Sequence, residues 1–122
     1  MSKQVAETLE KARALMNSGG KHWMKGDYRG TKKRGGDTCY CAIGALCAVL
    51  EVSPDTIDVH DFGSECIIKL VDALPPKADR KQGSATDCVI TYNDAPNRRW
   101  KHIDALFRRA IKLALDADSA AV

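Results

Sequence analysis

The sequence lacks the features that would assign it to a class directly. No apolar run approaches the ~20 residues of a membrane-crossing helix, and residues 1–4 contain no apolar signal region. A paired C-x-x-C motif, a glycine-rich phosphate loop, the Ser–His–Asp order of a hydrolase and an internal repeat are also missing. We therefore expect a cytoplasmic protein without a membrane segment, and no motif indicates a cofactor.

One domain, residues 1–122, accommodates the whole sequence, since a chain of this length can hide about two-thirds of its unfolded surface. Its central stretch begins with Asp37 and Thr38, which are helix-capping residue types, and continues with twelve residues without charge or proline. Because residues 41–50 are apolar or small on every side, they predict a helix that is buried all round. Gly44 and Ala45 would let another backbone come close. We predict a mainly α fold, a compact bundle of about four helices around this helix.

Three further segments have the apolar spacing of amphipathic helices, namely residues 4–16, 64–74 and 97–117. The tail, residues 118–122, is expected to fray. Residues 88–92 are β-branched and aromatic, which favours a short strand, and the region of Trp23 is its only plausible partner. The fold therefore includes, at most, a small two-stranded element.

Five cysteines are present, three of them between residues 39 and 47. Cytosolic thiols are normally reduced and free cysteine is among the most buried residue types, so we expect reduced cysteines in the core. The alternative is a zinc site. Cys39-x-Cys41 is too closely spaced for the usual zinc pair, and only the fold could bring His60, Cys66 and Cys88 to it. We predict no metal site.

Residues 19–36 form a basic, glycine-rich loop in which six cations face one aspartate. One interpretation is a solvated loop. The other is a cationic arm that meets an acidic protein or an anionic ligand such as a nucleotide or nucleic acid, with nearby aromatic rings able to stack on bases. The candidate binding residues are Trp23, Lys25, Arg29, Lys32, Lys33 and Arg34 in this region, with Arg98 and Arg99 at the start of the last helix.

A cysteine nucleophile is the enzymatic alternative. In the first turn of the buried helix, the dipole and the open N–H groups would favour a Cys41 thiolate and form an oxyanion hole. The chain order Cys41, then His60 or His102, then Asn93 or Asp94 is that of nucleophile, base and orienting group in cysteine proteases. However, the residues around Cys41 match no protease signature, and Asn-Asp shortly before a proline also indicates a helix cap. We favour packing for Cys41 and capping for the Asn-Asp pair.

Three short motifs occur in order along the chain. They are Trp23-x-x-Gly26, Cys41-Ala42-x-Gly44-Ala45 and Asn93-Asp94-x-Pro96, the last ahead of a terminal amphipathic helix. This pattern resembles a family of small uncharacterised proteins from actinobacteria and their phages, classed as a domain of unknown function. The family pattern usually has tryptophan where this chain has Tyr92, and a less basic linker. The resemblance covers residues 20–115 and implies a compact helical fold and a phage or actinobacterial origin, without an activity or catalytic residues.

These observations predict a small intracellular accessory or regulatory protein of phage type that binds a host macromolecule or an anionic ligand and is not an enzyme. Two alternatives remain. One is a cysteine-dependent hydrolase or transferase that uses Cys41, and the other is a nucleic-acid-binding protein that uses the arm at residues 21–36. The sequence leaves both a monomer and a dimer open.

Overall fold

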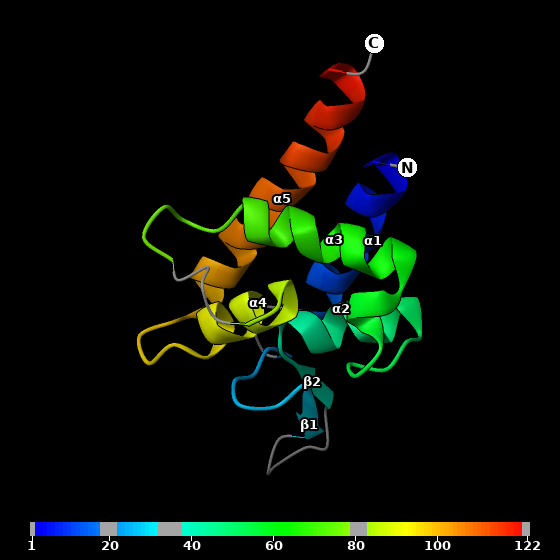
Figure 1. The fold of residues 1–122 in the computed structure, drawn as a ribbon. Coiled ribbons are helices and arrows are strands. Elements are labelled where there is room, and N and C mark those ends of the chain that lie inside the picture. Colours follow the sequence, from blue (N-terminus) through cyan, green and yellow to red (C-terminus); the bar gives the residue numbers. More distant parts are fainter. Residues whose placement is uncertain (1, 18–21, 32–37, 79–82, 121–122) are drawn as a thin grey trace.

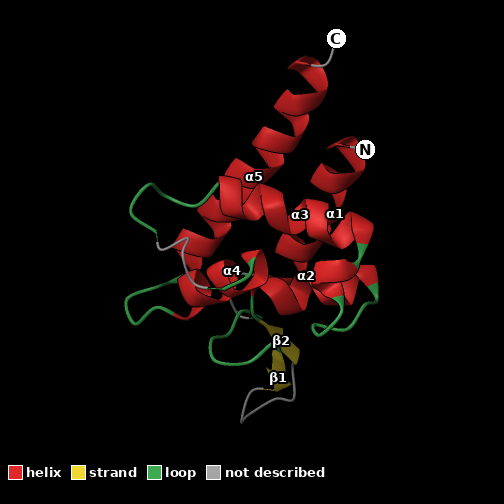
Figure 2. Cartoon of the chain, viewed as in Figure 1, coloured by secondary structure: helices red, strands yellow, loops and turns green. Residues whose placement is uncertain are grey.

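The computed structural model describes residues 2–17, 22–31, 38–78 and 83–120. They form a mainly α fold with one small sheet, which confirms the predicted fold class (Figure 1 and Figure 2). The elements in chain order are α1 (Ser2–Met16), β1 (Arg29–Thr31), β2 (Thr38–Tyr40), α2 (Ala42–Leu50), the 3-10 turn η1 (Ile57–Val59), α3 (Asp61–Asp72), α4 (Ala85–Asp94) and α5 (Trp100–Ala120). Within the described ranges, no helix is both long and apolar enough to cross a membrane.

Helix α2 confirms the helix predicted at residues 41–50 but not its burial on every side, since Ala48 is exposed and Val49 and Leu50 are half-buried. Its residues 42–47 are all buried, and α1, α3, α4 and β2 pack around it. A Cβ atom at Gly44 would overlap the carbonyl oxygen of Tyr28, so the chain before β1 touches the helix where glycine leaves room. The close backbone approach predicted at this position is confirmed.

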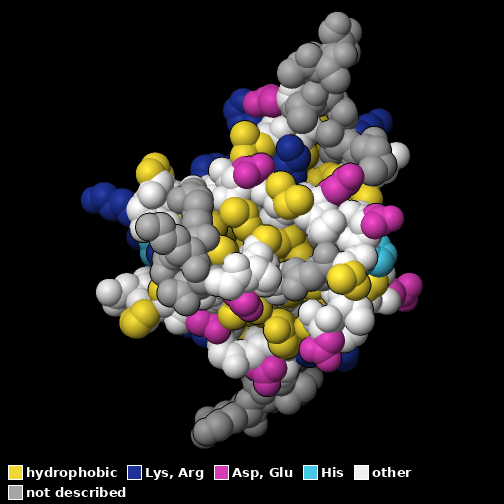
Figure 3. All heavy atoms as spheres, in the orientation of Figure 1, with side chains coloured by type: hydrophobic (Ala, Val, Ile, Leu, Met, Phe, Trp, Pro, Cys, Tyr) yellow, Lys and Arg dark blue, Asp and Glu magenta, His cyan; other side chains and the backbone are white. Residues whose placement is uncertain are grey.

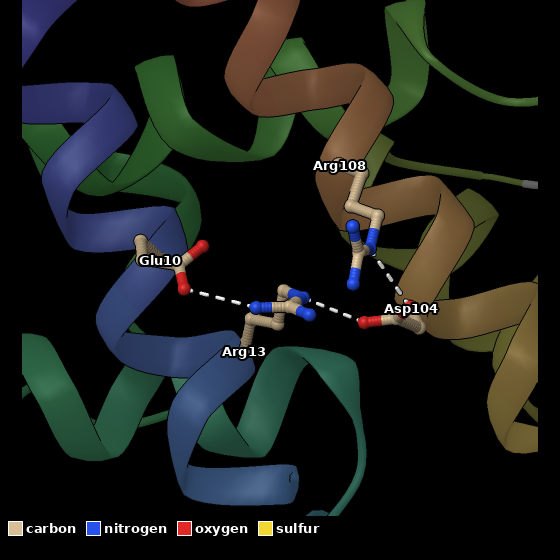
Figure 4. A network of polar contacts seen from close by, with 4 residues as sticks. All are labelled: Glu10, Arg13, Asp104 and Arg108. Atoms are coloured by element: carbon tan, nitrogen blue, oxygen red, sulfur yellow. Dashed lines mark hydrogen bonds and ion pairs between the residues drawn. The ribbon is translucent and has the colours of Figure 1, made fainter.

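Helices α1 and α5 lie side by side and run in opposite directions, which places both chain ends at one end of the molecule (Figure 1). A row of charged side chains joins them (Figure 4). Arg13 Nε donates to Asp104 Oδ1 at 2.6 Å, and Arg13 Nη1 donates to Glu10 Oε1 at 2.9 Å. Arg108 Nε donates to Asp104 Oδ2 at 2.9 Å. The half-buried Arg13–Asp104 pair therefore fixes the register of the two helices.

The small sheet is not the one predicted. β1 pairs with β2 in antiparallel register, with Gly30 opposite Cys39. The prediction that Thr38 caps the central helix is therefore wrong, because residues 38–40 are a strand and α2 begins at Ala42. Tyr40 explains the difference: its N–H donates to the His22 carbonyl at 2.7 Å and its carbonyl accepts from the Met24 N–H at 3.0 Å. These bonds satisfy the backbone in an extended conformation.

Residues 88–92 are helical, so the strand predicted there is also wrong. Helix α4 begins with a capping box in which the Ser84 hydroxyl accepts from the Asp87 N–H and the Asp87 carboxylate accepts from the Ser84 N–H. Helical spacing then buries Cys88, Val89 and Tyr92 in the core. The cap and this burial outweigh the β propensity of the segment.

We predict that Gly44→Ala destabilises the protein by about 2 kcal/mol or more, because the new methyl group overlaps the Tyr28 carbonyl. Helix propensity alone predicts the opposite, that Gly44→Ala raises the free energy of unfolding by about 1 kcal/mol. Urea unfolding measures the difference. Ala48→Gly, at an exposed position of the same helix, is the control. It should lower the free energy of unfolding by about 1 kcal/mol. An increased stability of Gly44→Ala would contradict the close approach.

Candidate functional site

The side chain of Asn93, at the end of α4, joins three separate parts of the chain. Its Oδ1 accepts from the Trp23 Nε1–H at 2.7 Å and from the Ala42 N–H at 3.1 Å. Its Nδ2 donates to the Met24 carbonyl at 3.0 Å and to Asp94 Oδ1 at 2.9 Å. Asn93 is 1% exposed; its bond to Ala42 is buried, and its bonds to Trp23, Met24 and Asp94 are partly buried. We call this region the Asn93 junction: residues 22–28, residues 93–96 and the first turn of α2.

The prediction that the Asn-Asp pair caps the last helix is wrong, because Asn93 caps α2 instead. Asn93 binds the first N–H of α2, and α5 begins six residues after Asp94, at Trp100. At that start the Arg99 N–H donates to His102 Nδ1 at 2.9 Å. A long-range cap of this kind leaves no signal in local spacing, because Asn93 and Ala42 are 51 positions apart.

The other junction contacts fasten residues 22–28 to residues 93–96. The Gly26 N–H donates to Asp94 Oδ1 at 3.0 Å. Lys25 Nζ donates to the Ala95 carbonyl at 2.7 Å. The half-buried Trp23 ring lies 6.5 Å from the ring of Trp100, centroid to centroid. The three motifs that carry the family resemblance thus contact one another, although they are far apart in the chain.

The candidate binding residues divide into three groups. Trp23, Lys25 and Arg98 make contacts within the protein; Arg98 donates from Nε to the Tyr92 carbonyl at 2.7 Å and stacks 3.6 Å from the centre of the Tyr92 ring. Arg29 and Arg99 are exposed. Lys32, Lys33 and Arg34 lie outside the described residues, as do residues 19–21. The structure thus gives Lys25 a role in the junction, whereas Arg98 contacts Tyr92 of α4 beside it.

Cys41 is the N-cap residue of α2, one position before the first turn, and it is 3% exposed. Its Sγ accepts from the Gly44 N–H at 3.3 Å. Burial raises the pKa of the Cys41 thiol; the N–H groups of α2 lower it, and the carboxylates of Asp94 and Asp27 raise it again, so that the pKa lies above its ordinary value. The N–H groups at the helix start thus favour a thiolate, as the enzymatic alternative supposes, but burial outweighs them.

A small cavity of about 180 Å³ lies beside this thiol. Cys41, Ile90 and the loop around Tyr28 line it, together with the carboxylates of Asp27 and Asp94. Such a lining disfavours both a thiolate and an anionic substrate. The cavity brings Cys41 and Asp94 together, but it does not form the oxyanion-stabilising environment of a cysteine hydrolase.

The three histidines are bound elsewhere. His102 Nδ1 accepts from Arg99, and its pKa is lowered by burial and by the cations Arg98, Lys101 and Arg99. His60 Nδ1 caps α3 by accepting from the Gly63 N–H at 2.9 Å. His22 Nδ1 lies 3.3 Å from the Thr38 carbonyl. None of the three described rings has Cys41 as its hydrogen-bond partner, so the proposed nucleophile–base pair is not assembled.

All five cysteines are buried, as predicted. Burial raises the pKa of Cys47 to about 11 and that of Cys66 to about 12. In the described part of the chain, no group of three or more His, Cys, Asp or Glu side chains is arranged to hold a metal ion. The cysteines therefore belong to the core.

We predict that Asn93→Ala destabilises the protein by about 3 kcal/mol, because it leaves the buried N–H of Ala42 and the partly buried indole N–H of Trp23 without their acceptor. Asn93→Asp is the matched variant, since it keeps the acceptor but places a carboxylate beside Asp94. Burial and that neighbour raise the folded-state pKa of the introduced carboxyl, so its stability deficit should shrink as the pH falls through that pKa. Denaturant unfolding as a function of pH measures the free energy of unfolding of both variants. Equal, pH-independent losses for the two variants would contradict this account of the junction.

We predict slow alkylation of every thiol in the folded protein at neutral pH, because the cysteines are buried and the pKa values of Cys41, Cys47 and Cys66 are raised. Iodoacetamide labelling followed by peptide mass spectrometry measures each site, with the urea-unfolded protein as the reference. Fast labelling of Cys41 alone would revive the nucleophile hypothesis.

The model of a family of unknown function, DUF6197, matches residues 1–113, a range that includes the whole Asn93 junction. No curated protein and no solved structure matches the chain. A family match over most of the sequence establishes membership, and the chain belongs to the DUF6197 family of unknown function.

Proposed function

We propose that the protein is a non-catalytic binding protein that contacts an anionic partner through its basic segment, residues 29–40. The observation that carries the proposal is the position of the charge. The basic segment includes four of the 19 lysines and arginines but only one of the 16 acidic residues, so it accounts for the whole formal net charge of +3. A local concentration of positive charge attracts acidic partners and speeds their association.

The position of the segment supports this role. Its strands β1 and β2 extend from the helices at the end of the molecule away from the two chain ends (Figure 1). The base of the sheet is tied to the Asn93 junction, since the Cys41 N–H donates to the Tyr28 carbonyl at 3.2 Å and Tyr40 bonds to His22. Arg29 presents an exposed cation on β1. A charged element on a fixed base can contact a partner while the helices keep their packing.

The neighbouring aromatic rings favour an acidic protein surface over a single-stranded nucleic acid. Binding of single strands uses exposed rings on which bases stack. Here Trp23, Tyr28 and Tyr40 pack against the hydrophobic core, and the Trp23 indole is held by Asn93. Recognition through charge alone suits an acidic protein segment, whose carboxylates pair with lysine and arginine.

We further propose an accessory or regulatory role in the cytoplasm, of phage type and directed at a host protein. The three-motif resemblance supports the phage type, and the raised pKa of the buried Cys41 supports a role without covalent catalysis.

We predict that the wild-type protein binds a fluorescent polyglutamate peptide at low salt. The triple substitution Lys32→Ala, Lys33→Ala, Arg34→Ala should weaken this binding at least about tenfold, because it removes three adjacent cations. Fluorescence anisotropy over a salt series measures the affinity. Duplex and single-stranded DNA of equal length serve as comparison probes.

The matched control is Lys3→Ala, Lys11→Ala, Lys77→Ala, which removes the same charge from exposed positions outside the basic segment. It should keep most of the affinity. An equal loss in both triple variants would reduce the effect to net charge and contradict the proposed site. Tighter binding of single-stranded DNA than of the peptide would favour the nucleic-acid alternative.

A further inference from the structure

A groove lies between the end of α3 and the outer face of α5, far from the basic segment. Its volume is about 610 Å³. Residues 72–76 form one wall, and Arg109, Lys112, Leu113 and Asp116 of α5 form the other. Arg109 Nε donates to the Ala73 carbonyl at 2.9 Å, which holds the end of α3 against α5 at the base of the groove.

The groove combines an apolar lining with an exposed apolar margin. Ala73, Leu74 and two prolines line it, Leu113 is 38% exposed, and Ile68, one turn before Asp72 on α3, is 50% exposed. Figure 3 shows hydrophobic side chains gathered over α3 and the neighbouring part of α5, with side chains of both charges around them. An exposed apolar patch with a charged rim is typical of a protein–protein contact.

The order of charges along α5 indicates which protein fits. The groove holds two cations, Arg109 and Lys112, and two acidic residues, Asp72 and Asp116, and within the chain Lys112 Nζ donates to Asp116 Oδ2 at 3.0 Å in an exposed pair. A partner of one charge would therefore meet repulsion as well as attraction. On α5 the cations come first, then Leu113, then Asp116. When two copies of this face meet in antiparallel orientation about a twofold axis between residues 112 and 113, Arg109 of each copy lies opposite Asp116 of the other. The two Leu113 side chains then meet near the axis.

We propose that the protein forms a symmetric homodimer through the α3–α5 groove, with antiparallel contact between the two α5 helices. A twofold interface requires one surface that is complementary to itself, and this face satisfies that condition in charge and in apolar content. The outer turns of α5 extend past α3, so a second helix can approach them (Figure 1). The contact lies away from β1 and β2, which leaves these two strands of each copy outside the interface.

Sedimentation velocity over a concentration series tests the proposal. The wild-type protein should sediment as a dimer at micromolar concentrations, and Leu113→Glu should raise the dissociation constant at least about tenfold, because it buries a charge at the axis. Leu15→Glu, at a similarly exposed leucine of α1 outside the groove, is the control and should remain dimeric. Circular dichroism confirms that each variant is folded. A monomeric wild type, or a dimer that Leu113→Glu leaves intact, would overturn the proposal.

A charge exchange tests the orientation. Asp116→Arg and Arg109→Glu should each weaken the dimer, and the double variant should recover most of the affinity, because opposite charges face each other again. If Arg109 acted only by holding the Ala73 carbonyl, the double variant would be no better than Arg109→Glu alone, and the antiparallel arrangement would be rejected.

Discussion

The buried amide of Asn93 is the interaction on which the arrangement of this protein depends. It pairs with an indole N–H, a helix N–H and a backbone carbonyl that lie 70, 51 and 69 positions away in the chain. A buried polar group without a partner is costly, and here the buried Asn93 amide and the buried Ala42 N–H are paired with each other and with partly buried groups of Trp23 and Met24. The amide therefore specifies where the chain before β1, the start of α2 and the end of α4 must meet. Gly44 completes the junction by admitting the Tyr28 backbone.

The sequence predicts the parts of the fold that depend on local pattern. The apolar run at residues 41–50 predicts the central helix, of which residues 42–47 are buried, and Gly44 predicts the close approach of another backbone. Residues 38–40 and 88–92 show the limits of such prediction. Tyr40 becomes extended through bonds to His22 and Met24, and residues 88–92 become helical through the Ser84 cap and burial of Val89. For Tyr40 the deciding partners, His22 and Met24, lie outside the window in which propensity operates. For residues 88–92 the Ser84–Asp87 capping box is a local signal, which outweighs the β propensity of the residues that follow it.

The sequence predicts the three motifs of the candidate site, but it does not predict which of their side chains contact one another. Trp23, Cys41 and Asn93 belong to three motifs that share one junction, yet no local rule assigns Asn93 to the start of α2. The same geometry decides between the roles proposed for Cys41. At the N-cap position its thiol lies beside Asp27 and Asp94, so burial and carboxylates raise its pKa. The charge of the molecule is unevenly distributed, with the strands of the basic segment at one end and the α3–α5 groove away from them.

Hydrogen exchange at the Trp23 indole tests the central claim, that the Asn93 junction is an integral part of the fold, most directly. If Asn93 holds Trp23 as the structure indicates, the Nε1–H proton exchanges only through global unfolding. Its opening free energy, followed by NMR, then equals that of the core amides of α2. Exchange by local opening, with a free energy far below that of the Leu46 amide, would show that residues 22–28 detach while the helices stay folded. The junction would then not be the constraint that organises the protein.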